Sequence, residues 1–446
     1  MNIQLDSLIT QESQKELVRH LRNLIRIDTT NPPGNEIEAA RYIADVLLQE
    51  HIEPTILEPS PGRGNLIARL KGAGSKRPLL LMSHLDVVAA DAKQWQHHPF
   101  EAEIHDDYVW GRGSVDCKNT VALWMMILLL LKRAHVVPKR DLVLLATADE
   151  ESGHRHGMEW LVNNHYDLVD AEAALNEGGG FGMEFSDQMF FTFQSAEKGN
   201  IWLNIVAKGT PGHASIPRRD NPVRRIAALS EKLARMRYPV QLTPSVQEML
   251  DHLAATRPPF QEKLFKMLLK PWSVRALISL AVRDEFMADG IRAMLSNTLC
   301  PTVLKAGSKV NVIPEEAACQ IDHRILPGYE LNEAVDDLIQ RIGPDFEVEI
   351  MDTRPATESR LDHELVGSIK KVLQQQCPDA KAIPLLSTGS TDASFLRSRG
   401  MAVYGFSPML QMDEMNLAHA NDERISLESL AFSLEVGLAV VLDYIM

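Results

Sequence analysis

The chain has 446 residues, of which 45% are hydrophobic and 24% charged, and its formal net charge is −14. This length suits two or three domains, and the composition excludes a disordered chain or a fibre. An acidic chain without a long basic stripe is a poor candidate for binding nucleic acid.

The N-terminus and the longest apolar run indicate in which cellular compartment the protein is expected to reside. Residues 1–14 are polar and lack the layout of a signal peptide, and the apolar run Val121–Leu131 is too short to span a bilayer. The four cysteines form no CxxC pair, which argues against a disulfide framework or a thiolate zinc site. We therefore expect a cytoplasmic protein with no membrane partner.

The first half of the chain alternates helical and strand-like segments. Helical apolar spacing covers residues 11–26 and 35–50, and a long apolar helix is expected at about 119–133. Short apolar runs that are typical of buried strands occur at 65–70, 79–83, 142–147 and 172–175. This alternation predicts an α/β domain with a mainly parallel sheet.

From about residue 198 the pattern changes to that of a smaller α+β unit. Its expected elements are a strand at 201–207, a helix near 221–236, a strand near 317–325, a helix near 331–342 and a strand near 346–351. Residues 244–299 read as a helical insertion with breaks at Pro258-Pro259 and Pro271.

Helix and strand signals resume after about residue 355 and end in a helix at about 427–444. The simplest organisation is one α/β domain, formed by residues 1–197 and 355–446, which is interrupted by a smaller α+β domain at 198–354.

A predicted apolar strand begins at Leu79, and His84 lies at its end, with Asp86 two residues later. Side chains two residues apart point the same way, and ligand sites of open α/β sheets lie at the carboxyl ends of strands. His84 could bind a metal while Asp86 orients its ring. A surface histidine beside a solvated aspartate explains this motif equally well when it is taken alone.

A glycine-bounded loop from Gly111 to Asn119 opens the long apolar helix. Asp116 precedes that helix and could be only its N-cap. A phosphate-binding loop is disfavoured because the GxxxxGK[ST] pattern is missing. Cys117 is interpreted as a small packing residue rather than a ligand.

A buried strand ends in three consecutive carboxylates, which include Glu150 and Glu151. Acidic clusters are usually solvated, but like charges at the carboxyl end of a strand repel unless they share a cation or a proton. Because neighbouring side chains point in opposite directions, one is expected to bind metal and the other to handle protons. His154 and His156 are interpreted as loop residues.

Glu177 follows another predicted strand and precedes a glycine turn, and His419 lies just ahead of the final helix. His419 could simply be a histidine at a helix start. Together, however, these segments bring several nitrogen and oxygen ligands to strand ends and helix starts. Such ligands suit zinc, and a shared carboxylate suits a pair of metal ions.

The sequence resembles the M20 family of metallopeptidases, which includes aminoacylases, acetylornithine deacetylase, succinyl-diaminopimelate desuccinylase and glutamate carboxypeptidase. The motifs that carry the resemblance, in family order, are SHLDVV at 83–88, GRGSVDCKN at 111–119, ADEESG at 148–153, NEGG at 176–179, KGTPGHAS at 208–215 and HANDE at 419–423. The resemblance implies a metallohydrolase catalytic domain with an inserted ferredoxin-like domain for lid function and dimerisation, and hence a homodimer.

The resemblance also implies a ligand set for two divalent ions, which are zinc or alternatively cobalt or manganese. Asp116 would bridge both ions. His84 and Glu177 would complete one site, and Glu151 and His419 would complete the other.

The remaining catalytic roles follow from the same resemblance. Glu150 would be the general base that takes a proton from the attacking water and later gives it to the leaving amine. Asp86 would orient His84. His213 of the GHAS-like motif would reach the active site of a partner subunit and stabilise the oxyanion.

Three further residues are implied in substrate binding. Arg324 has the fork geometry to clamp a substrate carboxylate, Asn311 could assist it, and the loop around Gly389 would line the pocket with backbone groups. Without the resemblance, Arg324 would be interpreted as part of a surface salt bridge. The insertion at 244–299 is longer than expected for the smaller family members. Residue 177 is a glutamate, as in the aminoacylase and desuccinylase branches, rather than the aspartate of the aminopeptidases.

The leading hypothesis is hydrolysis of the amide bond of an N-acyl-amino acid or small peptide. A dipeptidase or carboxypeptidase with the same core is the alternative within this class. A metal-binding but non-catalytic regulator is the alternative from another class. A nucleotide-binding protein is disfavoured because no strand is followed by GxGxxG or a P-loop.

Overall fold

The computed structural model describes residues 8–268, 270, 272–274, 276, 278 and 285–446. The chain forms two compact units: one comprises residues 1–195, 359–385 and 391–446, and the other comprises residues 196–358 and 386–390. The predicted domain limits, 1–197 with 355–446 for one domain and 198–354 for the other, stay a prediction. The predicted break at Pro271 lies outside the described residues.

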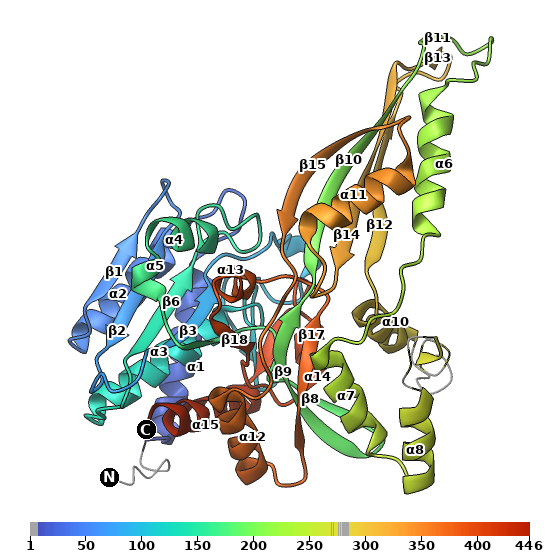
Figure 1. The fold of residues 1–446 in the computed structure, drawn as a ribbon. Coiled ribbons are helices and arrows are strands. Elements are labelled where there is room, and N and C mark those ends of the chain that lie inside the picture. The colour runs from blue at the N-terminus through green and yellow to red at the C-terminus, as the bar shows by residue number, and fades with distance from the viewer. Residues whose placement is uncertain (1–7, 269, 271, 275, 277, 279–284) are drawn as a thin grey trace. The chain divides into compact units, whose positions relative to one another are not determined.

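The first unit is built on a mixed sheet with the strand order β1-β2-β6-β3-β7-β18-β9 (Figure 1). The strands are β1 (Pro54–Leu57), β2 (Asn65–Leu70), β3 (Leu79–His84), β6 (Leu142–Thr147), β7 (Ala173–Asn176), β9 (Gln188–Glu197) and β18 (Ala402–Gly405). The central strands β6, β3, β7 and β18 are parallel. The outer pairs β1-β2, β2-β6 and β18-β9 are antiparallel. The α/β class is confirmed, with the parallel part at the centre of the sheet.

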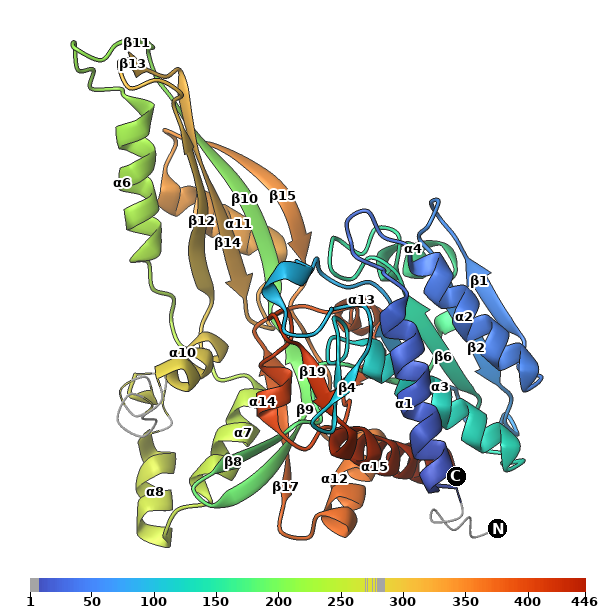
Figure 2. The same ribbon diagram turned by 180° about the vertical axis from the view of Figure 1, so that it is seen from behind.

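Helices cover both faces of this sheet, as the alternation of its buried side chains requires. Leu79 and Leu81 of β3 pack into the core on one face, whereas Leu80 and Met82 pack into a second core on the other. The helices of the first face are α1 (Gln11–Arg26), α2 (Glu36–Gln49), α3 (Lys118–Arg133), α12 (Glu364–Gln376) and α15 (Leu427–Ile445). The helices of the second face are α4 (Met158–Asn164), α5 (Tyr166–Val169) and α13 (Ala393–Arg397). Figure 1 shows α4 and α5 in front of the sheet, and Figure 2 shows α1 and α2 from the opposite side.

Two helices show how the sequence specifies this packing. A capping box between Thr10 and Ser13 starts α1, which buries one stripe of leucines. α3 is buried nearly all round and ends at the cationic pair Lys132 and Arg133, which suits the negative end of a helix. Within the described part of the chain, no helix is long and apolar enough to cross a membrane.

A small antiparallel sheet carries residues that lead into two of the predicted ligand loops. Its strands are β4 (Ile104–His105), β5 (Tyr108–Trp110) and β19 (Arg424–Ser426), in the order β19-β5-β4. β5 runs into the loop that holds Asp116, and β19 follows the segment that holds His419. Other short elements of this unit are β8 (Gly182–Phe185), which pairs with β9, and α14 (Met412–Met415). β17 (Lys381–Ser387) also pairs with β9.

The second unit contains an antiparallel sheet with the strand order β12-β14-β10-β15. Its main elements, in chain order, are β10 (Gly199–Lys208), α6 (Pro222–Ala234), β12 (Thr298–Ala306), β14 (Glu316–Ile325), α11 (Leu331–Ile342) and β15 (Glu347–Arg354). This βαββαβ succession is ferredoxin-like. Ile201, Leu203 and Ile205 alternate along β10 and pack with residues of α6 and α11.

The second unit also includes helices from the predicted helical insertion, α7 (Pro244–Ala254), α8 (Pro259–Leu268) and α10 (Glu285–Met294). Both α7 and α8 begin with proline, which is favoured at a first helical position because its missing N–H is not needed there. The short strands β11 (Gly212–His213) and β13 (Val312–Ile313) pair with each other, and β16 (Thr357–Glu358) pairs with the end of β9.

Candidate metal centre

The parallel strands of the first unit bring the predicted ligands to one edge of its sheet. His84 is the last residue of β3, Glu177 follows β7, and Glu150 and Glu151 follow β6. Asp116 lies just before α3. Because neighbouring parallel strands end at the same edge, segments far apart in the sequence converge there.

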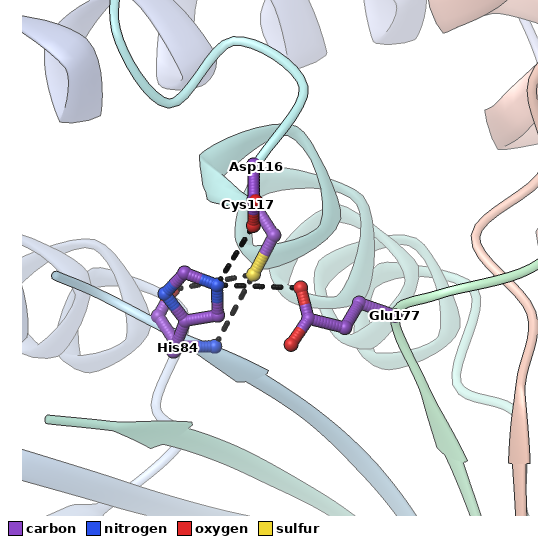
Figure 3. Close-up of side chains that lie close together, drawn as sticks. All are labelled: His84, Asp116, Cys117 and Glu177. Carbon is purple, nitrogen blue, oxygen red and sulfur yellow. Dashed lines mark hydrogen bonds and ion pairs between the residues drawn. The ribbon is translucent and has the colours of Figure 1, made fainter. Parts of the chain in front are cut away.

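The first cluster joins His84, Asp116 and Glu177. Nε2 of His84 lies 3.0 Å from Oδ1 of Asp116 and 3.3 Å from Oε2 of Glu177. Figure 3 shows these side chains pointing toward one another, with Cys117 beside them. The Cys117 thiol accepts a hydrogen bond from the backbone N–H of His84, and burial raises its pKa well above the usual range. Cys117 is thus a buried neighbour of the cluster with a neutral thiol.

The second cluster uses the other oxygen of Asp116. Nε2 of His419 lies 3.1 Å from Oδ2 of Asp116 and 3.1 Å from Oε1 of Glu151. A ligand atom of Glu150 lies within 4.8 Å of ligand atoms of both His84 and Glu151. The two carboxylate oxygens of Asp116 therefore face two different sets of potential metal ligands.

The charges of the centre are strongly coupled. Burial alone would raise the pKa of Asp116, but hydrogen bonds with His419 and His84 hold it below its usual range. Hydrogen bonds with Asp116 and Glu151 raise the pKa of His419 to about 10. Four carboxylates with two imidazoles form a donor set that suits divalent zinc-type cations, so these residues fit metal ions.

Asp86 connects the end of β3 to the carboxylates after β6. Its carboxylate accepts hydrogen bonds from the backbone N–H groups of Glu150 and Glu151, each at 3.0 Å, and from the Asn31 amide at 2.7 Å. Nδ1 of His84 contacts the backbone carbonyl of Asp86 at 2.9 Å and lies 3.5 Å from its carboxylate. Both the backbone carbonyl and the carboxylate of Asp86 thus lie beside Nδ1 of His84, and the carboxylate also positions the next loop.

Comparison with known proteins agrees with this arrangement. The model of peptidase family M20/M25/M40 matches residues 80–443, which include every residue of the two clusters. The chain belongs to this family. It is therefore a hydrolase that acts on peptide or amide bonds, in a family of metal-dependent enzymes.

Two curated relatives illustrate the range within the M20 family. The chain is 27% identical to the N-fatty-acyl-amino acid synthase/hydrolase PM20D1 of Xenopus tropicalis, over 98% of this chain and 88% of the relative. It is 25% identical to a probable succinyl-diaminopimelate desuccinylase of Staphylococcus aureus, over 98% of this chain and 99% of the relative.

Solved M20 structures share the fold. The metallo-carboxypeptidase Sso-CP2 of Sulfolobus solfataricus superposes with a TM-score of 0.74 at 17% identity, covering 97% of this chain and all (100%) of that one. The YXEP protein of Bacillus subtilis, described as a dinuclear metal-binding peptidase, gives a TM-score of 0.61 at 16% identity, covering 98% of this chain and 100% of that one.

Glu423 is a part of the M20 site to which no role was assigned from the sequence, although it closes the HANDE motif. Its buried carboxylate accepts hydrogen bonds from the backbone N–H groups of Gly113, Val115 and Asp116 at 3.1, 2.7 and 3.0 Å. It also pairs with the buried guanidinium of Arg112 at 2.6 Å. Glu423 therefore fixes the loop that presents Asp116 to both clusters.

A second buried network lies behind Asp86. Arg63 pairs with Glu36 and Asp149, both at 2.8 Å, and donates to the side-chain oxygen of Asn31 at 2.9 Å. Burial, together with the nearby Asp86 charge, raises the pKa of Glu36 to about 7. Of Arg63, Glu36, Asp149 and Asn31, only Asp149 belongs to a motif identified above, the ADEESG segment at 148–153.

His154 lies in a turn, as expected of a loop residue, but its side chain is fully buried. Its Nδ1 lies 2.6 Å from Oδ1 of Asp392, whose other oxygen accepts a hydrogen bond from the Thr147 hydroxyl at 2.6 Å. Thr147 ends β6, so this pair ties the strand end to the segment after β17.

The remaining predicted site residues lie in the second unit. His213 is exposed on β11, and its Nδ1 lies 2.7 Å from the Ser215 hydroxyl. Asn311 is exposed, and its carbonyl accepts a hydrogen bond from the backbone N–H of Ala214 at 3.0 Å. This contact keeps Asn311 beside the His213 segment.

Arg324 and Gly389 also lie in the second unit. Arg324 on β14 forms a two-point ion pair with Asp322 of the same strand at 2.7 and 2.9 Å. The backbone N–H of Gly389 donates to the Ser387 hydroxyl at 3.1 Å. The guanidinium of Arg324 is thus already paired in this structure, in line with the salt-bridge interpretation.

Proposed function

We propose that this M20 peptidase hydrolyses the amide bond of N-acyl-amino acids or small peptides with two divalent metal ions. The observation that carries the proposal is that the two carboxylate oxygens of Asp116 face different clusters: Oδ1 faces His84 and Oδ2 faces His419. Such a shared carboxylate suits a pair of metal ions.

In this proposal His84, Glu177 and Asp116 would hold one ion, and Glu151, His419 and Asp116 would hold the other. When bound, the ions, which we propose are zinc, would polarise the scissile carbonyl and lower the pKa of the attacking water.

Glu150 would serve as the general base. It lies beside Glu151 near both clusters, and burial raises its pKa well above the usual range of a glutamate. A carboxyl group with a raised pKa can accept a proton from water and hold it until the amine leaves. Asp86 would fix its position through the backbone N–H of Glu150.

Residues of the second unit would recognise the substrate. Arg324 would bind the substrate carboxylate by exchanging its ion pair with Asp322, because a guanidinium fits either carboxylate in the same two-point geometry. Asn311 and the backbone at Gly389 would complete the pocket. The names of two curated relatives, an N-fatty-acyl-amino acid synthase/hydrolase and a probable succinyl-diaminopimelate desuccinylase, support N-acyl-amino acids as the substrate class.

Exhaustive chelation should remove nearly all hydrolysis, and added zinc should restore it. The assay would compare N-acetyl, N-succinyl and long-chain N-acyl amino acids with dipeptides, with and without chelator. Full activity after chelation would contradict the metal mechanism. Cleavage of dipeptides alone would instead favour a dipeptidase with the same core. Bound metal without hydrolysis of any substrate would favour a regulator.

A shared active site predicts complementation between two inactive variants. We propose that the chain is a cytoplasmic homodimer in which His213 stabilises the oxyanion in the site of the partner subunit. His213→Ala should then lower kcat by at least about tenfold without a change in thermal stability, because the side chain is exposed. Mixing it with Asp116→Ala should restore part of the activity. No recovery, despite proven subunit exchange, would contradict the shared site.

A further inference from the structure

A separate group of nitrogen and oxygen ligands lies on the segment before β5, and the proposed hydrolysis does not use it. Nδ1 of His97 and Nε2 of His105 lie 3.1 and 2.8 Å from the same carboxylate oxygen, Oε2 of Glu103. The two imidazole rings stack with their centroids 3.8 Å apart. Three ligands from a short stretch of chain therefore converge on one point.

The spacing of these three atoms suits a metal ion. All three lie within 4.8 Å of one another. Two ligands of a tetrahedral zinc ion, each at the usual 2.0–2.1 Å from the metal, are ~3.3 Å apart. The observed separations from Glu103 are therefore close to those of two ligands on one ion, so little rearrangement is needed.

Neighbouring side chains pack against the imidazole rings, yet the three proposed ligands stay accessible to solvent. The indole of Trp110 packs edge-on against the His97 ring, with centroids 4.6 Å apart, and the guanidinium of Arg424 lies over the same indole. The side chains of His97, Glu103 and His105 are 24%, 41% and 45% exposed. A cation can thus enter from solvent, and water can supply a fourth ligand.

We propose that His97, Glu103 and His105 form an additional divalent-cation site, selective for zinc and for other ions that prefer nitrogen ligands together with oxygen. Two imidazoles and one carboxylate favour this class over magnesium or calcium, which prefer oxygen ligands. A bound ion would join the loop at His97 to β4 and so brace the hairpin that leads through β5 to the loop before α3. This site is independent of the proposed amide hydrolysis.

Zinc binding tests the site directly, with the full-length protein dialysed against micromolar zinc and its metal content measured. The double variant His97→Ala/His105→Ala should bind one zinc ion per chain fewer than the wild type. His98→Ala is the matched control, because His98 is an exposed neighbour outside the group and should leave the count unchanged. Equal zinc content in all three proteins would overturn the proposal.

Thermal melting gives a second readout that does not depend on catalysis. Zinc should raise the Tm of the wild type and His98→Ala by more than that of the double variant, because an ion that binds only the folded state stabilises it. If the double variant melts lower even without zinc, single His105→Ala and His105→Gln variants would replace it. Identical zinc-dependent shifts in wild type and variants would also overturn the proposal.

Discussion

Glu150→Gln should lower kcat by about 10²–10⁴-fold while the protein keeps its metal ions, since general acid–base catalysis contributes effects of this size. Glutamine preserves the shape of the side chain but cannot accept and return a proton. The measurement pairs steady-state kinetics on the best substrate found in the assay described above with metal analysis of the same preparation.

Substitutions of two other carboxylates provide the controls for this result. Glu151→Gln should lose metal as well as activity, because Oε1 of Glu151 belongs to the cluster of His419. Glu53→Gln, at an exposed position of the same unit, should change neither. Wild-type turnover of Glu150→Gln, or loss of its metal, would show that the roles of the two neighbours are wrongly assigned.

Glu423→Gln should destabilise the protein by about 3–5 kcal/mol, the usual cost of removing one partner of a buried ion pair. The change leaves the buried guanidinium of Arg112 uncompensated and turns an amide group toward backbone N–H donors. The loop that presents Asp116 should loosen, so metal affinity should fall together with the free energy of unfolding. Denaturant unfolding and metal titration would measure the two effects.

A matched pair of variants separates this effect from a general loss of charge. Glu435→Gln removes an exposed carboxylate from α15 and should change stability by less than about 0.5 kcal/mol. Adding Arg112→Leu to Glu423→Gln should cost less than the sum of the two single changes, because the unpaired cation is then gone. Unchanged stability of Glu423→Gln would contradict the role of this carboxylate.

The sequence predicted the central elements well because their patterns are locally determined. The helix expected at 11–26 is α1 with the same limits, and the strands expected at 65–70 and 142–147 are β2 and β6. The antiparallel flanks of the sheet were not predicted. The hairpin of β8 and β9 was missed, and strand direction at a sheet edge depends on tertiary pairing rather than on periodicity.

The candidate ligands could be named from the sequence because each lies at the end of a buried strand or ahead of a helix. Ligand-binding sites of α/β folds usually lie at these positions. Their supporting residues could not, since burial is what gives them a role. Glu423 is an ordinary acidic residue of a loop until its carboxylate meets three backbone N–H groups. The pairing of Arg324 with Asp322 likewise depends on side-chain geometry that no motif encodes.

The place of β18 in the sheet has a consequence for how the protein is made. Residues 402–405 lie beside residues 173–176 in the middle of the sheet, although the whole second unit separates them along the chain. A ribosome therefore completes the second unit before it supplies this strand, and His419 follows later still. We expect the growing polypeptide to expose the edge of β7 until residues 402–405 have been synthesised, and to gain its full ligand set only after His419 has followed.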